Sequence, residues 1–235
     1  MVSPERKRSV PLDFDGVAST YDLLTGLNPG YHRHLMRSAE RLSIRTPNPR
    51  LLDLCCGTGA STEALKRVYP DADIVGLDAS SGMLAEAEAK PGLDAVDFRL
   101  GDATDPRASG IVGDFDGVLM AYGIRNLPEP DRALRNIHGM LRPGATAVFH
   151  EYSVADSPVR AAIWDAVCLG IIVPGGMLTA RSSDIYRYLH KSVRSFDGVK
   201  AFEARLLAAG FADVWTGPMD GWQRGVVHSF VGRVS

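Results

Sequence analysis

Short apolar runs alternate with amphipathic stretches through the middle of the chain. The apolar runs have the length of buried strands and fall at residues 51–54, 73–77, 95–100, 115–120 and 145–151. Between them, apolar residues recur at helical spacing in residues 60–69, 82–90 and 130–141. Because strands alternate with helices, the pattern predicts an α/β fold with a parallel, doubly wound sheet.

The segments outside this region are predicted to be mainly helical and to end in two strands. Residues 1–12 are expected to be a mobile tail, 13–22 a short helix and 31–43 an amphipathic helix. The later segments are a helix broken by Pro174-Gly175-Gly176, two further helices and an antiparallel strand pair, at residues 159–173, 182–195, 198–209, 211–216 and 225–234.

Length and composition favour one domain. The chain has 235 residues and 45% apolar content, enough for one sizeable core. Within a single domain 1–235 we expect a helical N-terminal cap, a cofactor-binding core, a helical lid over an acceptor site, and a C-terminal helix with the strand pair. These parts would cover residues 1–45, 46–154, 155–196 and 197–235.

Charge and cysteine content exclude several classes of protein. With 26 basic and 28 acidic residues, nothing suggests a nucleic-acid partner. The three cysteines, two of them adjacent, match neither a disulfide framework nor a zinc pattern, and no cluster suggests a metal. The basic N-terminus lacks the apolar segment of a signal peptide, and no apolar run reaches the ~18 residues of a membrane span. We therefore predict a cytoplasmic protein.

A glycine-rich turn between the first strand and its helix is the main candidate for a binding site. Gly57 and Gly59 lack Cβ atoms and let a ligand approach the backbone, while the helix from Ala60 offers unpaired N–H groups. Position 62 is Thr, where the dinucleotide fingerprint has Gly.

Acidic residues at successive strand ends indicate the ligand. Asp53 would repel phosphate and suits an ammonium group, and Asp78 can accept hydrogen bonds from two ribose hydroxyls. Asp102 can accept the amino group of adenine. A ligand with an amino-acid end and a ribose but no phosphate is S-adenosylmethionine (SAM). The alternative is an ordinary βα turn in a flavodoxin-like domain.

Several motifs resemble those of one enzyme family. They are Tyr21-Asp22, Leu52-Asp53-Leu54-Cys55-Cys56-Gly57-Thr58-Gly59, Gly123-Ile124-Arg125-Asn126, Leu141-Arg142-Pro143-Gly144 with Glu151 and Ser153, and Tyr186-Arg187-Tyr188-Leu189 with Ser192. From about Phe14 onwards the chain resembles the ubiquinone/menaquinone C-methyltransferases of the UbiE/MenG type. The resemblance implies the class I SAM-dependent methyltransferase fold, which is Rossmann-like, with a mostly parallel seven-stranded sheet and an antiparallel C-terminal strand.

The residues expected to contact SAM combine the acidic strand ends with the resemblance. They are Tyr21, Asp53, Cys55, Gly57, Thr58, Gly59, Asp78, Ala79, Met83, Asp102, Ala103, Ala121 and Tyr122. The acceptor would be an aromatic quinol or phenol, such as a demethylmenaquinol. Its expected contacts are Asn126, Tyr152, Trp164, Tyr186, Tyr188 and His190.

The chain departs from the family mainly in the acceptor half. His150 stands where the family has an aliphatic residue, Ala121 where it has Ser, and Leu35 where it has Trp. His150, Arg125 and Tyr122 are the candidate catalytic residues, because a hydroquinone carbon becomes nucleophilic only when its hydroxyl loses a proton. An imidazole with a pKa near ~6.5 suits that task, with Tyr186, His190 or the acceptor as its partner. Alternatively, His150 is a structural histidine.

The apolar segment 155–196 is expected to line the acceptor pocket, or else only to pack on the sheet. A prenylated acceptor would bring part of this segment into contact with a membrane. Other possibilities are a specialised-metabolite O-, N- or C-methyltransferase, a SAM-binding protein without methyl transfer, and a nicotinamide reductase. The sequence leaves open whether the protein forms a homodimer.

Overall fold

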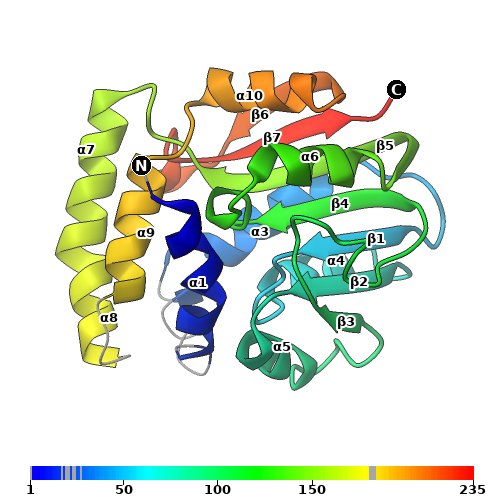
Figure 1. The fold of residues 1–235 in the computed structure, drawn as a ribbon, viewed down its shortest axis with the longest axis horizontal. Helices are drawn as coiled ribbons and strands as arrows, with labels where there is room; N and C mark the ends of the chain where they lie inside the picture. Colours follow the sequence, from blue (N-terminus) through cyan, green and yellow to red (C-terminus); the bar gives the residue numbers. More distant parts are fainter. Residues whose placement is uncertain (1, 17, 19–21, 23–24, 27, 180–183) are drawn as a thin grey trace.

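A seven-stranded sheet with the strand order β3-β2-β1-β4-β5-β7-β6 forms the centre of the protein. The computed structural model describes residues 2–16, 18, 22, 25–26, 28–179 and 184–235. Neighbouring strands from β3 to β5 pair in parallel, whereas β7 is antiparallel to both β5 and β6. The strands are β1 (Arg50–Leu54), β2 (Asp73–Asp78), β3 (Asp97–Leu100), β4 (Phe115–Ala121), β5 (Leu141–Tyr152), β6 (Ala212–Pro218) and β7 (Val227–Arg233). This architecture confirms the predicted fold class (Figure 1).

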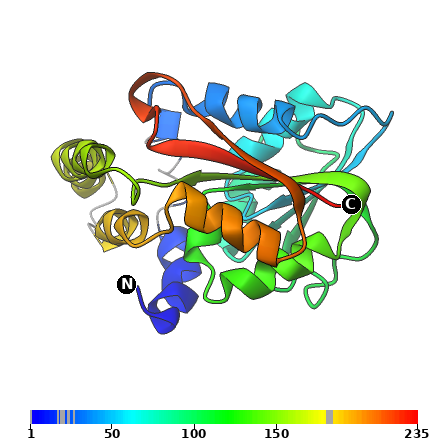
Figure 2. The same cartoon turned by 90° about the horizontal axis from the view of Figure 1, so that it is seen from above.

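Helices cover both faces of the sheet, because its central strands bury side chains on both sides. On β5, for example, Val148 packs toward α3 and α4, while its neighbour Phe149 packs toward α6 and α10. Figure 2 shows these two helical layers on opposite sides of the sheet. The helices of the layers are α3 (Tyr31–Glu40), α4 (Ala60–Val68), α5 (Ser81–Glu88), α6 (Pro130–His138) and α10 (Val199–Ala208).

The N-terminal segment is a helix, α1 (Pro4–Asp15), so the predicted mobile tail is wrong. Val10 on this helix is buried, and the Asp15 carboxylate accepts hydrogen bonds from Ser80 and Gly82 at the start of α5. The sequence of α1 is too polar for a clear helical pattern. Contacts with α5 and with α9 (Asp184–Arg194) stabilise the helix instead.

The predicted helix break at Pro174-Gly175-Gly176 is also wrong. Helix α7 (Pro158–Val167) continues through a π-helical turn at Cys168–Ile172 into α8 (Val173–Thr179). In a regular α-helix the ring of Pro174 would meet the carbonyl of Gly170. The wider π-turn, in which the Val173 N–H donates to the Cys168 carbonyl, relieves this conflict.

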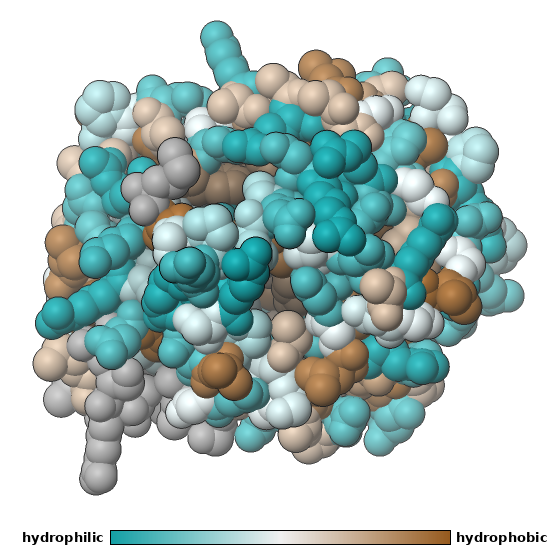
Figure 3. Space-filling model, viewed as in Figure 1, coloured by the Kyte–Doolittle hydropathy of each residue, from teal (hydrophilic) through white to brown (hydrophobic). Residues whose placement is uncertain are grey.

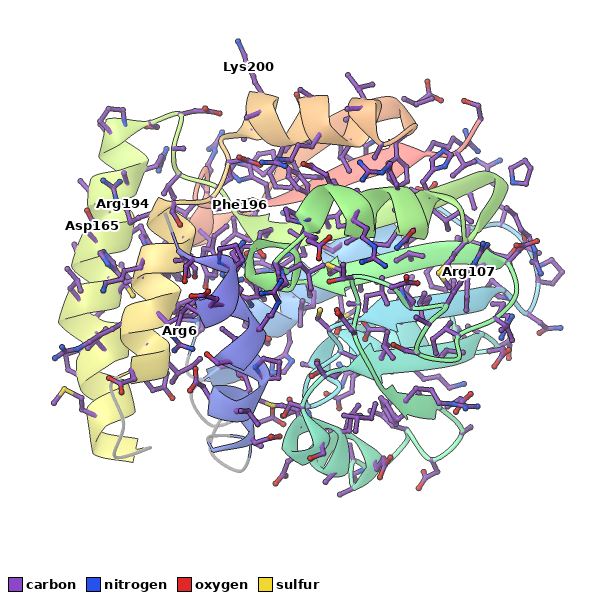
Figure 4. The ribbon with its side chains drawn as sticks, in the orientation of Figure 1. Arg6, Arg107, Asp165, Arg194, Phe196 and Lys200 are labelled. Atoms are coloured by element: carbon purple, nitrogen blue, oxygen red, sulfur yellow. The ribbon has the colours of Figure 1, made fainter. Side chains whose placement is uncertain are left out.

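Helices α7 and α9 form a separate layer at one end of the sheet, next to α1 (Figure 1). The carboxylate of Asp165 on α7 lies 2.7 Å from His190 Nε2 and 3.6 Å from Arg194 Nε, both on α9. Figure 4 shows Asp165 and Arg194 on these neighbouring helices. The fully buried Trp164 packs its ring 4.6 Å from that of Tyr152 and so attaches α7 to the end of β5.

One continuous helix among the described residues, Pro158–Met177, is long and apolar enough to cross a membrane, judged by length and composition alone. The sequence analysis found no such run, because Asp165 interrupts it and a break was expected at Pro174. Core helices of water-soluble proteins meet the same criterion, so this finding does not place the protein in a membrane.

The contact between α8 and α9 gives a test of this fold. A Cβ atom on Gly176 would lie 2.1 Å from the Tyr186 ring, whereas one on Gly175 would have no heavy atom within 4 Å. Both Gly→Ala changes increase helix propensity. The difference in stability between the two variants therefore measures the clash with Tyr186. We expect Gly176→Ala to have a free energy of unfolding about 1–3 kcal/mol below that of Gly175→Ala in urea titrations. Equal stabilities would contradict the packing of α8 on α9.

Candidate active site

A cavity of about 290 Å³ lies where the carboxyl ends of β1, β2, β3 and β4 meet. This is the edge at which doubly wound sheets bind ligands. Eleven of the residues predicted from the sequence to form the site lie on its wall: Cys55, Gly57, Thr58, Asp78, Ala79, Met83, Asp102, Ala121, Tyr122, Arg125 and Asn126. The turn after β1 and the Gly-Ile-Arg-Asn segment after β4 therefore share one cavity.

The two glycines of the turn have different structural roles. Both have left-handed backbone conformations, with φ of 55° at Gly57 and 85° at Gly59. A Cβ on Gly59 would lie 2.9 Å from Leu93, so this glycine permits packing away from the cavity. A Cβ on Gly57 would have no heavy atom within 4 Å, so Gly57 keeps the cavity side of the turn open.

The carboxylate of Asp78 holds the turns after β1 and β2 together. One oxygen accepts a hydrogen bond from the Gly57 N–H at 2.8 Å and the other from the Ser80 N–H at 2.9 Å. Burial raises the pKa of Asp78, and the backbone N–H groups oppose that shift. Asp78 thus fixes the shape of the site and also lies on its wall, as expected for a ribose contact.

Asp53 does not reach the cavity, contrary to the expected direct contact with SAM. Its fully buried carboxylate accepts hydrogen bonds from the hydroxyls of Ser61 at 2.8 Å and Thr62 at 2.7 Å. Burial raises the pKa of Asp53 to about 7. Ser61 lies on the cavity wall, so its hydroxyl connects the Asp53 carboxylate to the cavity. Thr62, at the position of the fingerprint glycine, donates its hydroxyl to the same carboxylate oxygen.

Thr58 connects the glycine turn to the N-terminal region. Its hydroxyl donates to the carboxylate of Asp22, which also forms an ion pair with Lys90 at 2.6 Å. Tyr21, a predicted SAM contact, lies outside the described residues. Gly59 and Ala103 are not on the wall of the cavity, which differs from their predicted roles.

Arg125 lies on the cavity wall and is anchored behind it. Its Nη1 donates to the Glu151 carboxylate at 2.8 Å and to the Tyr122 carbonyl at 2.7 Å, and its Nε donates to the Ser192 hydroxyl at 3.3 Å. Burial raises the pKa of Glu151, and the positive charge of Arg125 opposes this shift. The guanidinium therefore presents a fixed positive charge at the cavity.

His150 lies behind Tyr122 in a buried chain of hydrogen bonds. Its Nε2 is 2.9 Å from the Tyr122 hydroxyl and its Nδ1 is 2.7 Å from the Ser38 hydroxyl, which in turn is 2.7 Å from the Ser229 hydroxyl. The side chain is 0% exposed, and burial lowers the pKa of His150 to about 3. The expected pKa near 6.5 and the expected partners Tyr186 and His190 are wrong.

Sequence reasoning missed Ser38 and Ser229. A signal for Ser38 existed, since it is a polar residue on the apolar face of the predicted helix 31–43, beside Leu35, Ala39 and Leu42. For Ser229, which lies in an otherwise ordinary strand, the sequence gives no comparable signal.

The expected acceptor contacts divide into two groups. Asn126 lies on the cavity wall, where its Oδ1 accepts a hydrogen bond from the Tyr188 hydroxyl at 3.0 Å. The remaining expected contacts pack between β5, α7 and α9. Among the described residues of segment 155–196, no side chain lines the cavity. The residues away from the wall are Tyr152, Trp164, Tyr186, Tyr188 and His190.

The wall expected from residues 155–196 is formed by α1 instead, which contributes Lys7, Arg8, Val10, Pro11 and Phe14.

Within the part of the chain that the structure describes, no group of three His, Cys, Asp or Glu side chains could hold a metal ion.

Comparison with known proteins identifies relatives over most of the chain. The ubiE/COQ5 methyltransferase family matches residues 2–232. A demethylmenaquinone methyltransferase of Lactiplantibacillus plantarum is 33% identical over 207 residues, covering 86% of each chain. The ubiquinone/menaquinone biosynthesis C-methyltransferase UbiE of Methylobacterium nodulans is 36% identical over 221 residues, covering 87% of each.

Solved structures share the fold at low sequence identity. The [4+2]-cyclase SpnF superposes with a TM-score of 0.69 at 19% identity, covering 96% of this chain and 94% of that one. The plantazolicin methyltransferase BpumL, in complex with SAH, has a TM-score of 0.65 at 15% identity and covers 98% and 96%.

The position of Asp78 gives a test of the cofactor site. We expect Asp78→Ala to weaken SAM binding by about 1–3 kcal/mol, roughly 5- to 150-fold, because it removes the predicted ribose acceptor and unpairs two backbone N–H groups. Isothermal titration calorimetry measures this effect. Asp97→Ala, an exposed acid on β3 paired with Arg99, is the control and should keep full affinity. Unchanged affinity in Asp78→Ala would refute the assignment.

Proposed function

We propose that this chain, which belongs to the ubiE/COQ5 methyltransferase family, transfers the methyl group of SAM to a ring carbon of a quinol-type aromatic acceptor. The observation that carries the proposal is that two distant motifs share one cavity. Gly57 of the SAM turn and Arg125 of the Gly-Ile-Arg-Asn segment both lie on its wall. The demethylmenaquinone methyltransferase relatives supply the class of acceptor.

The residues on the wall fit SAM. The backbone at Gly57, where a Cβ would have no heavy atom within 4 Å, leaves room for a ligand. Asp78 would hold the ribose and Asp102 the adenine amino group, while Asp53 would act on the amino-acid end through Ser61. When bound, SAM supplies a methyl group activated by its sulfonium charge.

We assign to Tyr122 the role of binding the hydroxyl group of the acceptor. A neutral His150 that donates through Nδ1 to Ser38 can accept, at Nε2, a hydrogen bond from the Tyr122 hydroxyl. The Tyr122 oxygen then directs its lone pairs towards an acceptor hydroxyl in the cavity. His150 is thus a positioning residue, because a pKa of about 3 makes the imidazole a poor base near neutrality.

Arg125 and Asn126 would stabilise the acceptor once its hydroxyl has released its proton to solvent. The fixed, buried guanidinium of Arg125 offers positive charge to a developing oxyanion in the cavity. Asn126 is held from both sides, since its Nδ2 donates to the Tyr122 carbonyl at 3.1 Å and its Oδ1 accepts from Tyr188. A preorganised polar wall of this kind favours attack by a ring carbon.

A prenylated acceptor would require contact with a lipid surface, and the helix formed by α7, the π-turn and α8 offers one. Val159, Leu169, Ile171 and Met177 on this helix are each more than half exposed. Elsewhere on the face seen in Figure 3, hydrophobic residues form small separate patches within a hydrophilic surface. We therefore propose that any membrane contact is peripheral and confined to this helix.

The proposed function is tested by supplying the acceptor. We expect the purified protein, with SAM and a reduced demethylmenaquinol carrying a short prenyl tail, to form one ring-methylated product per SAM consumed. Mass spectrometry with labelled SAM, followed by NMR, locates the methyl group, and flotation with liposomes reports membrane contact. Methylation of oxygen alone would instead support a specialised-metabolite enzyme. SAM binding without turnover of any quinol would support a protein that does not transfer methyl.

The role of His150 is tested by His150→Phe. We expect kcat to fall by about 10²-fold, because Tyr122 loses the partner that orients its hydroxyl, while SAM affinity stays unchanged. Since His150 stays neutral above its pKa of about 3, the wild-type rate between pH 5 and pH 8 should show no loss from its protonation. His138→Phe on α6, away from the cavity, is the control. Full turnover with lower thermal stability would make His150 purely structural.

A further inference from the structure

Two cationic residues of α1, Lys7 and Arg8, lie on the cavity wall and have no role in the function proposed above. The neighbouring Arg6 differs from them. Its guanidinium pairs with Asp13 at 2.6 Å and lies over the Tyr188 ring, outside the cavity. Figure 4 shows Arg6 in the region between α1 and α9.

Lys7 has a backbone partner but no carboxylate partner. Its half-buried ammonium donates to the Leu127 carbonyl at 3.0 Å. Among the described residues, no carboxylate oxygen lies within 4 Å of the charged groups of Lys7 or Arg8. An ammonium group has three donors, so the bond to Leu127 leaves capacity for another acceptor.

The carboxylates whose charges act on Lys7 already have their own cations. Glu151 and Asp197 exert an attractive charge on the ammonium, but Glu151 is bonded to Arg125 and Asp197 to Arg205. Burial lowers the pKa of Lys7 most, and the positive charges of Arg125 and Arg205 lower it further. A partly desolvated cation of this kind is stabilised when an anion enters the adjoining cavity.

Apart from Arg125, which follows β4, the charges on the cavity wall are divided between two groups of elements. Asp78 and Asp102 follow β2 and β3, where the ribose and adenine of SAM are assigned, whereas Lys7 and Arg8 come from α1. Lys7 contacts Leu127, next to the Asn126 that we assign to the acceptor. The positive group therefore adjoins the acceptor part of the cavity.

We propose that Lys7, assisted by Arg8, binds a carboxylate group on the aromatic acceptor, so that an acidic hydroxyaromatic compound is bound more tightly than the matching neutral one. This inference rests on the proposed methyl transfer and adds a binding preference within its acceptor class. Lys7 could instead bind the carboxylate of SAM itself. The experiment must therefore distinguish a carboxylate of the acceptor from that of SAM.

The test compares two probes that differ by one carboxylate, 1,4-dihydroxynaphthalene and its 2-carboxylated derivative, kept reduced under anaerobic conditions. Calorimetry measures their binding to the protein saturated with S-adenosylhomocysteine, so the result does not depend on turnover. We expect the carboxylated probe to bind roughly 10- to 100-fold more tightly. Lys7→Met should abolish this preference without changing the affinity for the neutral probe or for SAM, and Lys7→Arg should retain it.

Lys66→Met is the matched control, because Lys66 also donates to a backbone carbonyl, that of Pro70, and lies away from the cavity. It should keep the full preference. If Lys7→Met does not fold, Arg8→Met replaces it and should reduce the preference. Steady-state kinetics then place the effect in KM for the carboxylated probe, with kcat little changed.

Three results would overturn the proposal. The first is a wild-type protein with no preference between the probes. The second is a Lys7→Met variant that binds SAM weakly yet still discriminates, which would assign Lys7 to the carboxylate of SAM. The third is an equal loss of the preference in Lys66→Met, which would show that the effect depends only on the net charge of the protein. Lys7-dependent binding of the carboxylated probe, with no methylation of that probe or of demethylmenaquinol, would refute the proposed function but leave this subsite intact.

Discussion

The buried ion pair between Arg125 and Glu151 connects the cavity to three other parts of the fold. Glu151 is on the central strand β5, and Arg125 follows β4 and also bonds to Ser192 on α9. Removing either partner would leave an uncompensated buried charge, which is far more costly than losing an exposed pair. Because Arg125 also holds the Tyr122 carbonyl, the same pair fixes the end of β4 at the cavity.

The sequence was informative where local pattern decides the structure. The glycine turn, the acids at the strand ends and the alternation of strands and helices are each encoded within about ten residues, and all appear close to their predicted places. By contrast, α1 and the continuous helix through Pro174 depend on neighbours. Val10 and Phe14 of α1 become a buried face only against α5 and α9, and the π-turn before Pro174 has no pattern of its own.

Many of the residues expected in the site lie on one cavity wall, but their burial and hydrogen-bond partners were not predictable from the sequence. Position at a strand end identified His150 and Asp53, but it could not reveal that both would be fully buried. Burial changes their pKa in opposite directions, to about 3 for His150 and to about 7 for Asp53, because it disfavours the charged form of each. The partner Ser38 is 112 residues from His150 in sequence, a separation that no local pattern records.

The attachment of α1 to the start of α5 has a consequence for the shape of the cavity. Asp15 bonds to Ser80 and Gly82, two and four residues beyond Asp78, while α1 itself forms part of the cavity wall. A displacement of α1 would therefore alter two walls of the cavity together, because it would also break the hydrogen bonds at the start of α5.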